Sequence, residues 1–422
     1  MRIVPLKQLS RVDISNVDKK SKEGEPEVVL CNFVDVYRNW AITGALVPSL
    51  MSATANQNQI DRFSLHKGQV AITKDSETRD DIGVAAYIAD EIENGVLGYH
   101  CALITPDENL LLGSYLNIVL HSPYAQKYFE ANASGSGQRY TLTNEIIEGF
   151  PVPLPDINTQ EKLGTLCMEI DSKISNNNAI CSELEEIAKL LYDYWFVQFD
   201  FPDENGKPYK SSGGKMVWNE ELKREIPEGW RLSKLGKECE VLLGGTPDTT
   251  KQEYWDGDIP WLNSGEVASS PVLSAEKSIT KIGMNSSATA FAKAGAVVMS
   301  ITRYIRPSIL GIDACFNQSV VAVKPTERLH TSYIYPLMKS NVRNYMALRT
   351  GAQQPHINKE IVEDTVLICP ADDVLKKYYQ QIEVIYAQLM NVSKESKLLI
   401  SLRDFLLPML MNGQVKVANT AK

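Results

Sequence analysis

The sequence contains one pattern twice, and this internal repeat limits the possible folds more than any other feature. Four segments of the first half match four segments of the second half in the same order. The offset between matched residues falls from 231 at Asn32 and Asn263 to 215 at Glu145 and Glu360, as expected for diverged copies separated by loop insertions and deletions. The matched pairs are 30–36 with 261–267, 67–73 with 294–300, 102–110 with 321–329, and 137–148 with 352–363.

Each copy is predicted to be a mixed module of α-helices and β-strands. Apolar runs rich in β-branched residues and bounded by Gly, Pro or Asp predict strands at 69–73, 101–104, 296–301 and 320–323. Helices are expected over 114–131 and 332–348. Each copy then reaches a proline, Pro155 or Pro370, just before a long helical segment.

Two long helices with narrow apolar stripes follow the two copies. The 3-4 spacing of the stripes is typical of a coiled coil, with a break at Ser396 and polar seam positions at Lys173 and Asn177. Pro408 should kink or end the second helix, and Gly413 is a stop signal beyond it. We expect the helices to pair antiparallel; the alternative is two amphipathic helices on separate cores. The seam residues are Leu163, Leu166, Ile170, Ile180, Leu184, Ile187, Leu191 and Tyr194 in the first helix, and Leu375, Tyr378, Ile382, Ile385, Leu389, Val392, Leu399, Leu402, Leu406 and Met409 in the second.

Composition and charge narrow the class of protein. A chain of 422 residues suggests two or three domains, and it contains no apolar run long enough to span a bilayer and no signal peptide. Seven scattered cysteines without a Cys-x-x-Cys pair indicate reduced thiols, which predicts a cytoplasmic protein. The net charge of −9 argues against nucleic-acid binding without excluding it, because a local basic patch is sufficient.

Motifs of catalysis are absent from the sequence. We find no phosphate-binding loop, no Gly-x-Gly-x-x-Gly, no Asn-Pro-Pro-aromatic tetrapeptide and no pair of histidines spaced for a metal. The fragments Asp18-Lys-Lys and Glu221-Leu-Lys resemble part of a nuclease motif, but such tripeptides are expected by chance in a charged chain. We therefore expect no catalytic residue and no metal site.

Several loops instead carry residues suited to DNA. The turn around Gly245 and Thr246 could place N–H groups and a hydroxyl against a phosphate, or it could be a plain strand-to-loop turn. Arginines suit guanine edges and phosphates, and glutamine amides suit adenine, although a solvated loop or a helix cap explains the same residues. The other candidate DNA-binding residues are Lys74, Arg79, Gln138, Arg139, Tyr140, Arg303, Tyr304, Arg306, Gln353 and Gln354.

Four segments resemble parts of a known family. Tyr194-Trp-Phe-Val-Gln-Phe-Asp-Phe-Pro and Asn205-Gly-Lys-Pro-Tyr-Lys are similar to the central conserved region of type I restriction–modification specificity subunits. Gly244-Gly-Thr-Pro resembles the start of their second target-recognition domain, and Leu402-Arg-Asp-Phe-Leu-Leu-Pro resembles the end of their distal helix. The first copy has no Gly-Gly-Thr-Pro, so that loop's role does not carry over to it.

The resemblance implies an α+β chain of two mixed target-recognition domains, 1–155 and 229–370, with a pseudo-two-fold repeat. They are separated by two long antiparallel coiled-coil helices, 156–200 and 371–415, with a connector at 201–228. It implies a non-catalytic subunit that reads a bipartite double-stranded DNA target for host defence. It also implies two methyltransferase subunits that use S-adenosylmethionine, and restriction subunits that use ATP and magnesium. A stand-alone nuclease and a coiled-coil adaptor that binds only proteins are the alternatives.

Overall fold

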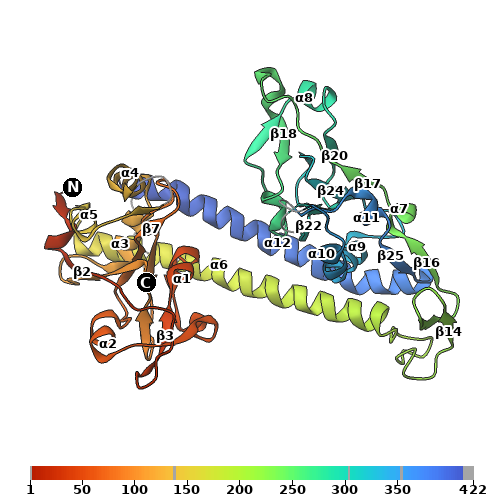
Figure 1. Ribbon diagram of the computed structural model, residues 1–422, viewed down its shortest axis with the longest axis horizontal. Helices are drawn as coiled ribbons and strands as arrows, with labels where there is room; N and C mark the ends of the chain where they lie inside the picture. The colour runs from red at the N-terminus through yellow and green to blue at the C-terminus, as the bar shows by residue number, and fades with distance from the viewer. Residues whose placement is uncertain (1, 136–138, 303–304, 352–354, 412–422) are drawn as a thin grey trace. The chain divides into compact units, whose positions relative to one another are not determined.

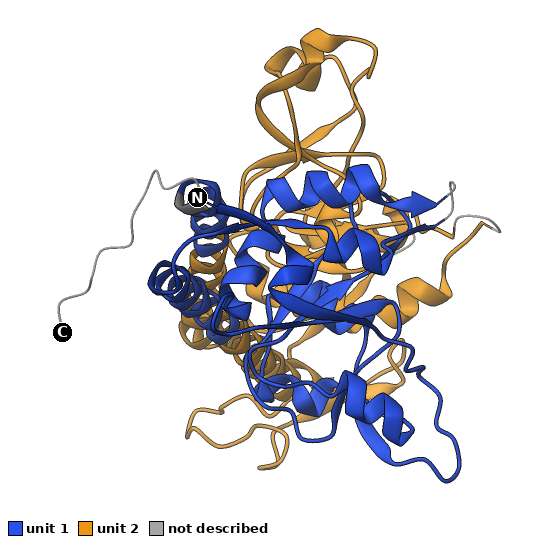
Figure 2. Ribbon diagram, turned by 90° about the vertical axis from the view of Figure 1, so that its left-hand side faces the viewer, with its two compact units in different colours: residues 1–176, 398–422 blue, residues 177–397 orange. Residues whose placement is uncertain are grey.

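Much of the strand pairing in the first half of the chain repeats in the second half. The computed structural model describes residues 2–135, 139–302, 305–351 and 355–411. These belong to two units, unit 1 with residues 1–176 and 398–422 and unit 2 with residues 177–397 (Figures 1 and 2). The boundary between the units falls inside both long helices, α6 (Ile157–Tyr192) and α12 (Asp372–Met411).

Unit 1 contains a five-stranded sheet of order β2-β10-β6-β8-β4 and a smaller sheet of order β5-β3-β9. Its elements before α6 are β1 (Arg2–Pro5), β2 (Ser10–Ile14), β3 (Glu27–Cys31), α1 (Phe33–Arg38), β4 (Ala41–Ile42), β5 (Met51–Thr54), α2 (Gln57–Phe63), β6 (Val70–Thr73), β7 (Asp75–Ser76), β8 (Ala85–Ile88), β9 (Gly95–Leu97), β10 (Cys101–Pro106), α3 (Gly113–Leu120), α4 (Pro123–Asn132), β11 (Ser134–Gly135), β12 (Tyr140–Thr141), α5 (Asn144–Glu148) and β13 (Pro151–Leu154).

Unit 2 contains two four-stranded sheets, of order β17-β24-β21-β22 and β19-β18-β23-β20. After a π-helical turn at Asp193–Val197, its elements before α12 are β14 (Met216–Asn219), β15 (Arg224–Pro227), β16 (Arg231–Lys234), α7 (Leu235–Glu238), β17 (Val241–Leu243), β18 (Trp255–Leu262), β19 (Lys277–Ile279), α8 (Lys281–Asn285), β20 (Ala290–Ala292), β21 (Val297–Ser300), β22 (Pro307–Ile309), β23 (Ala314–Phe316), β24 (Val320–Val323), α9 (Thr331–Ser340), α10 (Val342–Ala347), α11 (Lys359–Glu363) and β25 (Val366–Cys369).

The register of equivalent strands confirms the predicted repeat. Thr73 of β6 lies opposite Cys101 of β10, and Ser300 of β21 lies opposite Val320 of β24. The offsets between these equivalents, 227 and 219, are those of the sequence matches. The parallel pairs β3·β9 and β18·β23, and the outer pairs β1·β13 and β16·β25, repeat in the same way. Buried apolar side chains of equivalent strands therefore face equivalent cores.

Local hydrogen bonds repeat as well. The side chain of Asn32 accepts the Val34 N–H, and Asp35 accepts the Asn32 N–H, which closes a capping box at the start of α1. Asn263 and Glu266, at the matched positions, exchange the same pair of side-chain-to-backbone bonds. The first pair of matched segments, 30–36 and 261–267, therefore starts a helical turn with the same hydrogen bonds in both copies.

Both predicted helices of the modules are broken in two. The segment 114–131 forms α3 and α4, because Ser122 caps α4 through the Ala125 N–H and Pro123 disfavours helical backbone at the residue before it. The segment 332–348 forms α9 and α10, which meet at Asn341. The two predicted helical stretches are therefore helical, and each consists of two helices.

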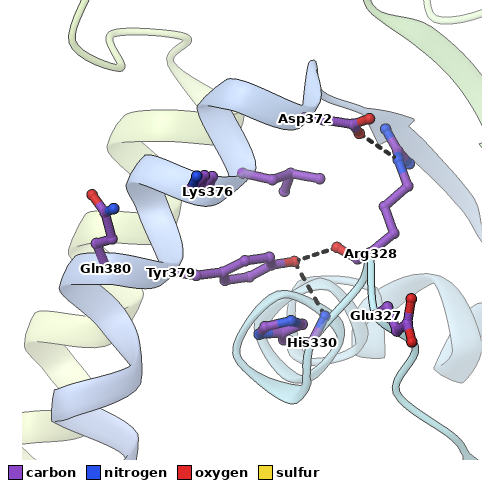
Figure 3. Close-up of a pocket in the computed structure, with 8 residues that line it drawn as sticks. Glu327, Arg328, His330, Asp372, Lys376, Tyr379 and Gln380 are labelled. Carbon is purple, nitrogen blue, oxygen red and sulfur yellow. Dashed lines mark hydrogen bonds and ion pairs between the residues drawn. The ribbon is translucent and has the colours of Figure 1, made fainter.

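In each unit, a side chain of the long helix hydrogen-bonds two backbone groups of the module. In unit 2 the Tyr379 hydroxyl donates to the Arg328 carbonyl at 2.9 Å and accepts the His330 N–H at 3.1 Å (Figure 3). In unit 1 the Gln160 side chain bonds the Leu110 carbonyl at 3.0 Å and the Leu112 N–H at 2.9 Å. Different side chains thus satisfy the same two backbone groups ahead of α3 and α9.

The helices α6 and α12 are antiparallel neighbours within each unit. In unit 2, Asn177 donates to Glu395 at 2.9 Å, and the Trp195 and Tyr378 rings lie 5.5 Å apart. In unit 1, Leu163 and Cys167 share a core with Leu407. Residue numbers rise along α6 as they fall along α12, which confirms antiparallel pairing and excludes helices packed only on separate cores.

The seam register in α6 differs from the prediction at every second position. Of the predicted seam residues, Leu163, Ile170 and Asn177 are buried, and Leu184 and Leu191 are half-buried. The intervening seam positions lie one residue later, so that Ile174 is buried whereas the predicted Ile180 and Ile187 are exposed and Leu166 is half-buried. At three of these positions the prediction favoured a larger apolar side chain than the one that the helix pair takes up. At the fourth, the predicted seam residue Lys173 is exposed and its neighbour Ile174 is buried. The intervening positions are Cys167, Ile174, Cys181 and Ala188.

The seam of α12 continues through Ser396, which is buried, so the predicted break is absent. After Leu399 the next seam position is Arg403, and Leu402 is 46% exposed. The helix also continues through Pro408 to Met411, because a proline removes one N–H but keeps a helical φ angle. Gly413 lies outside the described residues.

The corrected register predicts which isoleucine of α6 stabilises the protein. Ile174→Ala should lower the free energy of unfolding by about 2–4 kcal/mol, because it empties a buried seam position. Ile187→Ala is the matched control on the same helix and should cost less than about 1 kcal/mol. Urea unfolding of the full chain, followed by helical circular dichroism, measures both. A larger loss for Ile187→Ala would restore the register predicted from sequence.

Candidate nucleic-acid interface

A buried carboxylate, Asp75, gathers cationic side chains in unit 1. Its Oδ2 atom lies 2.9 Å from Lys74 Nζ and 3.3 Å from Arg139 Nη2. His100 Nδ1 contacts both Asp75 and the Arg139 guanidinium. The Asp75 side chain is 10% exposed whereas that of Arg139 is 57% exposed, so the cluster presents the arginine to solvent from a buried anchor.

Three separate segments build this cluster. β7 pairs with β12, which places Thr141 opposite Asp75 and Tyr140 opposite Ser76. His100 enters from the turn between β9 and β10, where its φ of 71° lies in the left-handed region. Its ring packs against Tyr99 at 3.9 Å between centroids. The cluster thus depends on strand pairing across the module.

Asp75 is ionised throughout the physiological pH range. Burial raises the pKa of Asp75, but hydrogen bonds from Thr141, His100 and Lys74, with the charge of Lys74, outweigh that effect. Together these interactions lower the pKa of the Asp75 carboxyl to about 2. The carboxylate is therefore a fixed negative charge on which the cations are oriented.

The cluster forms one wall of a surface hollow of about 520 Å³. The rings of Phe33 and Tyr37, which stack at 5.7 Å, also line the hollow, and the Tyr37 hydroxyl donates to Asp81 at 2.9 Å. Carboxylates and a guanidinium thus line the same hollow. Its lining residues are Phe33, Tyr37, Asp75, Ser76, Glu77, Thr78, Asp81, His100 and Arg139.

The structure brings together four of the unit 1 residues proposed from sequence. Arg139 borders the hollow, and the Arg79 guanidinium lies 5.0 Å from the centre of the Tyr140 ring. Lys74 is only 19% exposed and is engaged by Asp75, so it is an internal ion pair rather than a free cation. Sequence reasoning missed Asp75, His100, Phe33 and Tyr37, because nothing in the spacing of these residues indicates that strand pairing joins them. Gln138 lies outside the described residues.

The Gly-Gly turn of unit 2 has a structural explanation. The Gly244 N–H donates to the Val320 carbonyl and the Gly245 N–H to the Phe316 carbonyl, so neither is available to a phosphate. A Cβ at Gly244 would lie 2.2 Å from the Asn317 carbonyl oxygen, which only glycine avoids. The interpretation of this turn as a phosphate cradle was wrong for its glycine N–H groups. The exposed Thr246 hydroxyl donates to Gln318.

Among the described residues of unit 2, the positions matched to the anchor of the unit 1 cluster carry other side chains. Thr302 and Ser319 stand at the positions matched to Asp75 and His100. Arg306 is exposed just before β22. Arg303, Tyr304, Gln353 and Gln354 lie outside the described residues. The two modules therefore share a framework and differ in the chemistry of equivalent loops.

The described residues do not support a metal site, a nuclease site or a membrane-spanning helix. Within the described ranges, no group of His, Cys, Asp and Glu side chains could hold a metal ion. Asp18 accepts the Lys20 N–H in a turn, and Glu221 lies in the turn between β14 and β15. No described helix combines the length and the apolar character needed to cross a membrane.

Comparison with known proteins identifies the family. Residues 18–186 and 227–398 each match the type I restriction modification DNA specificity domain. The type I restriction enzyme HindI specificity subunit of Haemophilus influenzae is 22% identical, with 97% of this chain and 99% of that protein covered. The MjaIX specificity subunit of Methanocaldococcus jannaschii is also 22% identical, covering 73% of this chain and 70% of that protein.

A solved structure shows the same fold. The S subunit of a type I restriction–modification system from M. genitalium superposes with a TM-score of 0.55 at 13% identity, covering 97% of this chain and 95% of that one. Both copies of the repeat correspond to copies of the family's domain. The chain belongs to the family of type I restriction–modification DNA specificity subunits, which recognise DNA and are not themselves catalytic.

Proposed function

We propose that each repeat of this specificity subunit reads one half of a bipartite DNA target, and that α6 and α12 set the distance between the halves. The observation that carries the proposal is the repeated strand register, which gives two equivalent frameworks with different loops. We assign residues 1–155 and 229–370 to the two target-recognition domains, 156–200 and 371–415 to the helices, and 201–228 to the connector.

We further propose that each helix docks one methyltransferase subunit through an exposed apolar patch. On α6, Ile187 and Leu190 are 49% and 60% exposed. On α12, Leu402 and Phe405 are 46% and 66% exposed. The offset of 215 between the repeats at this point relates Ile187 to Leu402 and Leu190 to Phe405.

These equivalent patches favour two copies of the same partner. Apolar side chains that remain exposed at matched positions of two helices are typical of interaction surfaces. The methyltransferase subunits would use S-adenosylmethionine, and restriction subunits would add ATP- and magnesium-dependent translocation and cleavage. The seam corrections support the docking proposal, because Ile187 and Leu402 lie on the outer faces of the helices.

The first test is sequence-specific methylation. The chain with its cognate methyltransferase subunit should methylate adenines in one bipartite motif, whereas the chain alone should neither methylate nor cut DNA. Methylome sequencing of cells with and without the gene measures this. If no bipartite motif disappears on deletion, the chain does not read a split target. Cutting by the purified chain with magnesium alone would support a nuclease instead.

The docking patches predict stepwise loss of partners. Leu190→Asp or Phe405→Asp should each reduce the complex from two methyltransferase subunits to one, because a carboxylate would be desolvated in an apolar interface. The double variant should bind none. Native mass spectrometry measures the stoichiometry, and Glu186→Ala is the control on α6. Unfolding stability should change by less than about 0.5 kcal/mol, because both side chains are exposed. Two bound partners in the double variant would exclude these patches.

Helix length should set the spacing of the target. One heptad inserted into both α6, after Asn176, and α12, after Lys397, adds about 10.5 Å of helix, which equals roughly 3 base pairs of DNA. Such a variant should methylate a motif with a gap longer by that amount and with unchanged half-sites. Unchanged spacing would show that the helices do not measure DNA.

A further inference from the structure

The Arg139 guanidinium is an exposed cation of the first repeat that neighbouring side chains hold in place. Its contacts with Asp75 and His100 all involve Nη2. A guanidinium has five N–H donors in a rigid fork, so this attachment leaves the other donors available beside the hollow. Its anchor is fixed in turn, because Asp75 is also held by Lys74 at 2.9 Å. The side chain therefore loses little conformational entropy when it meets a ligand.

The lining of the hollow favours a base edge over a phosphate as the partner of Arg139. Glu77 and Asp81 line the same hollow as Arg139, and Asp75 is ionised at its wall. A phosphate seated there would meet these carboxylates as well as the guanidinium, and like charges repel. The edge of a base pair carries no net charge and offers donors and acceptors side by side. Carboxylates accept from cytosine N4, and a guanidinium fork donates to guanine O6 and N7.

We infer that Arg139 contacts O6 and N7 of one guanine in the half-target read by the first repeat, and that Asp75 is a positioning residue for this contact. The inference rests on the proposed function. It applies to one half-target, because Thr302 and Ser319 replace Asp75 and His100 at the matched positions of unit 2. The carboxylates beside Arg139 then face the cytosine of the same base pair.

The test measures how tightly the complex with its methyltransferase subunits binds a DNA duplex. The duplex contains the sequence motif that this complex methylates. Each guanine of the motif is replaced in turn by 7-deazaguanine, which lacks the N7 acceptor. Replacement at one guanine, within one half-site, should weaken binding roughly tenfold. In the Arg139→Gln complex the same replacement should have no further effect, since the donor is already missing.

Three further variants separate base contact from other roles. Arg139→Lys keeps the charge but loses the fork, so it should lower discrimination at that guanine while the salt dependence of binding stays unchanged. Asp75→Asn should reduce the loss of binding that 7-deazaguanine causes at that guanine. The variant complex should still assemble, and 7-deazaguanine in the other half-site should affect it as it affects the wild type. Lys7→Gln, an exposed residue of unit 1, is the charge control and should change neither measurement.

Different failures have different meanings. Arg139→Gln could weaken binding to all duplexes equally and lower the slope of log binding constant against log salt concentration by about 1. In that case Arg139 contacts a phosphate and the inference is wrong. If Arg139→Gln binds like the wild type, or if the motif contains no guanine, the cluster is only structural. If the wild-type complex selects no bipartite motif at all, the proposed function fails instead.

Discussion

Burial of the heptad seams between α6 and α12 is the interaction on which both units depend. In unit 1 the seam residues Leu163 and Cys167 lie in the core of the first module, and Leu407 of α12 joins them there. In unit 2, Tyr378 of α12 packs with Trp195 in the core of the second module. Since the same side chains close the helix pair and the module cores, neither core would be complete without both helices.

The repeat explains how one framework can serve two different contacts. Tyr115 and Tyr333 stand at equivalent places, and each donates a hydrogen bond to the strand before its long helix, at Pro153 and at Ile368. These bonds join α3 to β13 in unit 1 and α9 to β25 in unit 2. The loops themselves are free to differ, as Asp75 and Thr302 show. This division suits a protein whose two domains must present different chemistry to DNA on the same framework.

For contact with DNA, the local arrangement of charged side chains matters more than the chain's net charge of −9. The chain holds a cluster in which one buried carboxylate, with its pKa lowered to about 2, orients Lys74, His100 and Arg139. Acidic residues around the cluster favour contact with base edges over general attraction to phosphates. The exposed apolar patches of the helices similarly fit a subunit whose other surfaces meet proteins rather than DNA.

The sequence by itself determined the repeat, the antiparallel helix pair and the places of β6, β10, β21 and β24, because these rest on collinear matches and on periodic burial of apolar side chains. The family followed from the resemblance of short motifs to known specificity subunits. The sequence could not determine the alternate seam positions in α6, where Ile180 and Ile187 outrank Cys181 and Ala188 in hydrophobicity but lie outside the helix pair. Only the tertiary structure decided that register, because close helix packing selects side chains by shape as well as by polarity. It also decided the Asp75 cluster, since pairing of β7 with β12 joins residues that are distant in sequence.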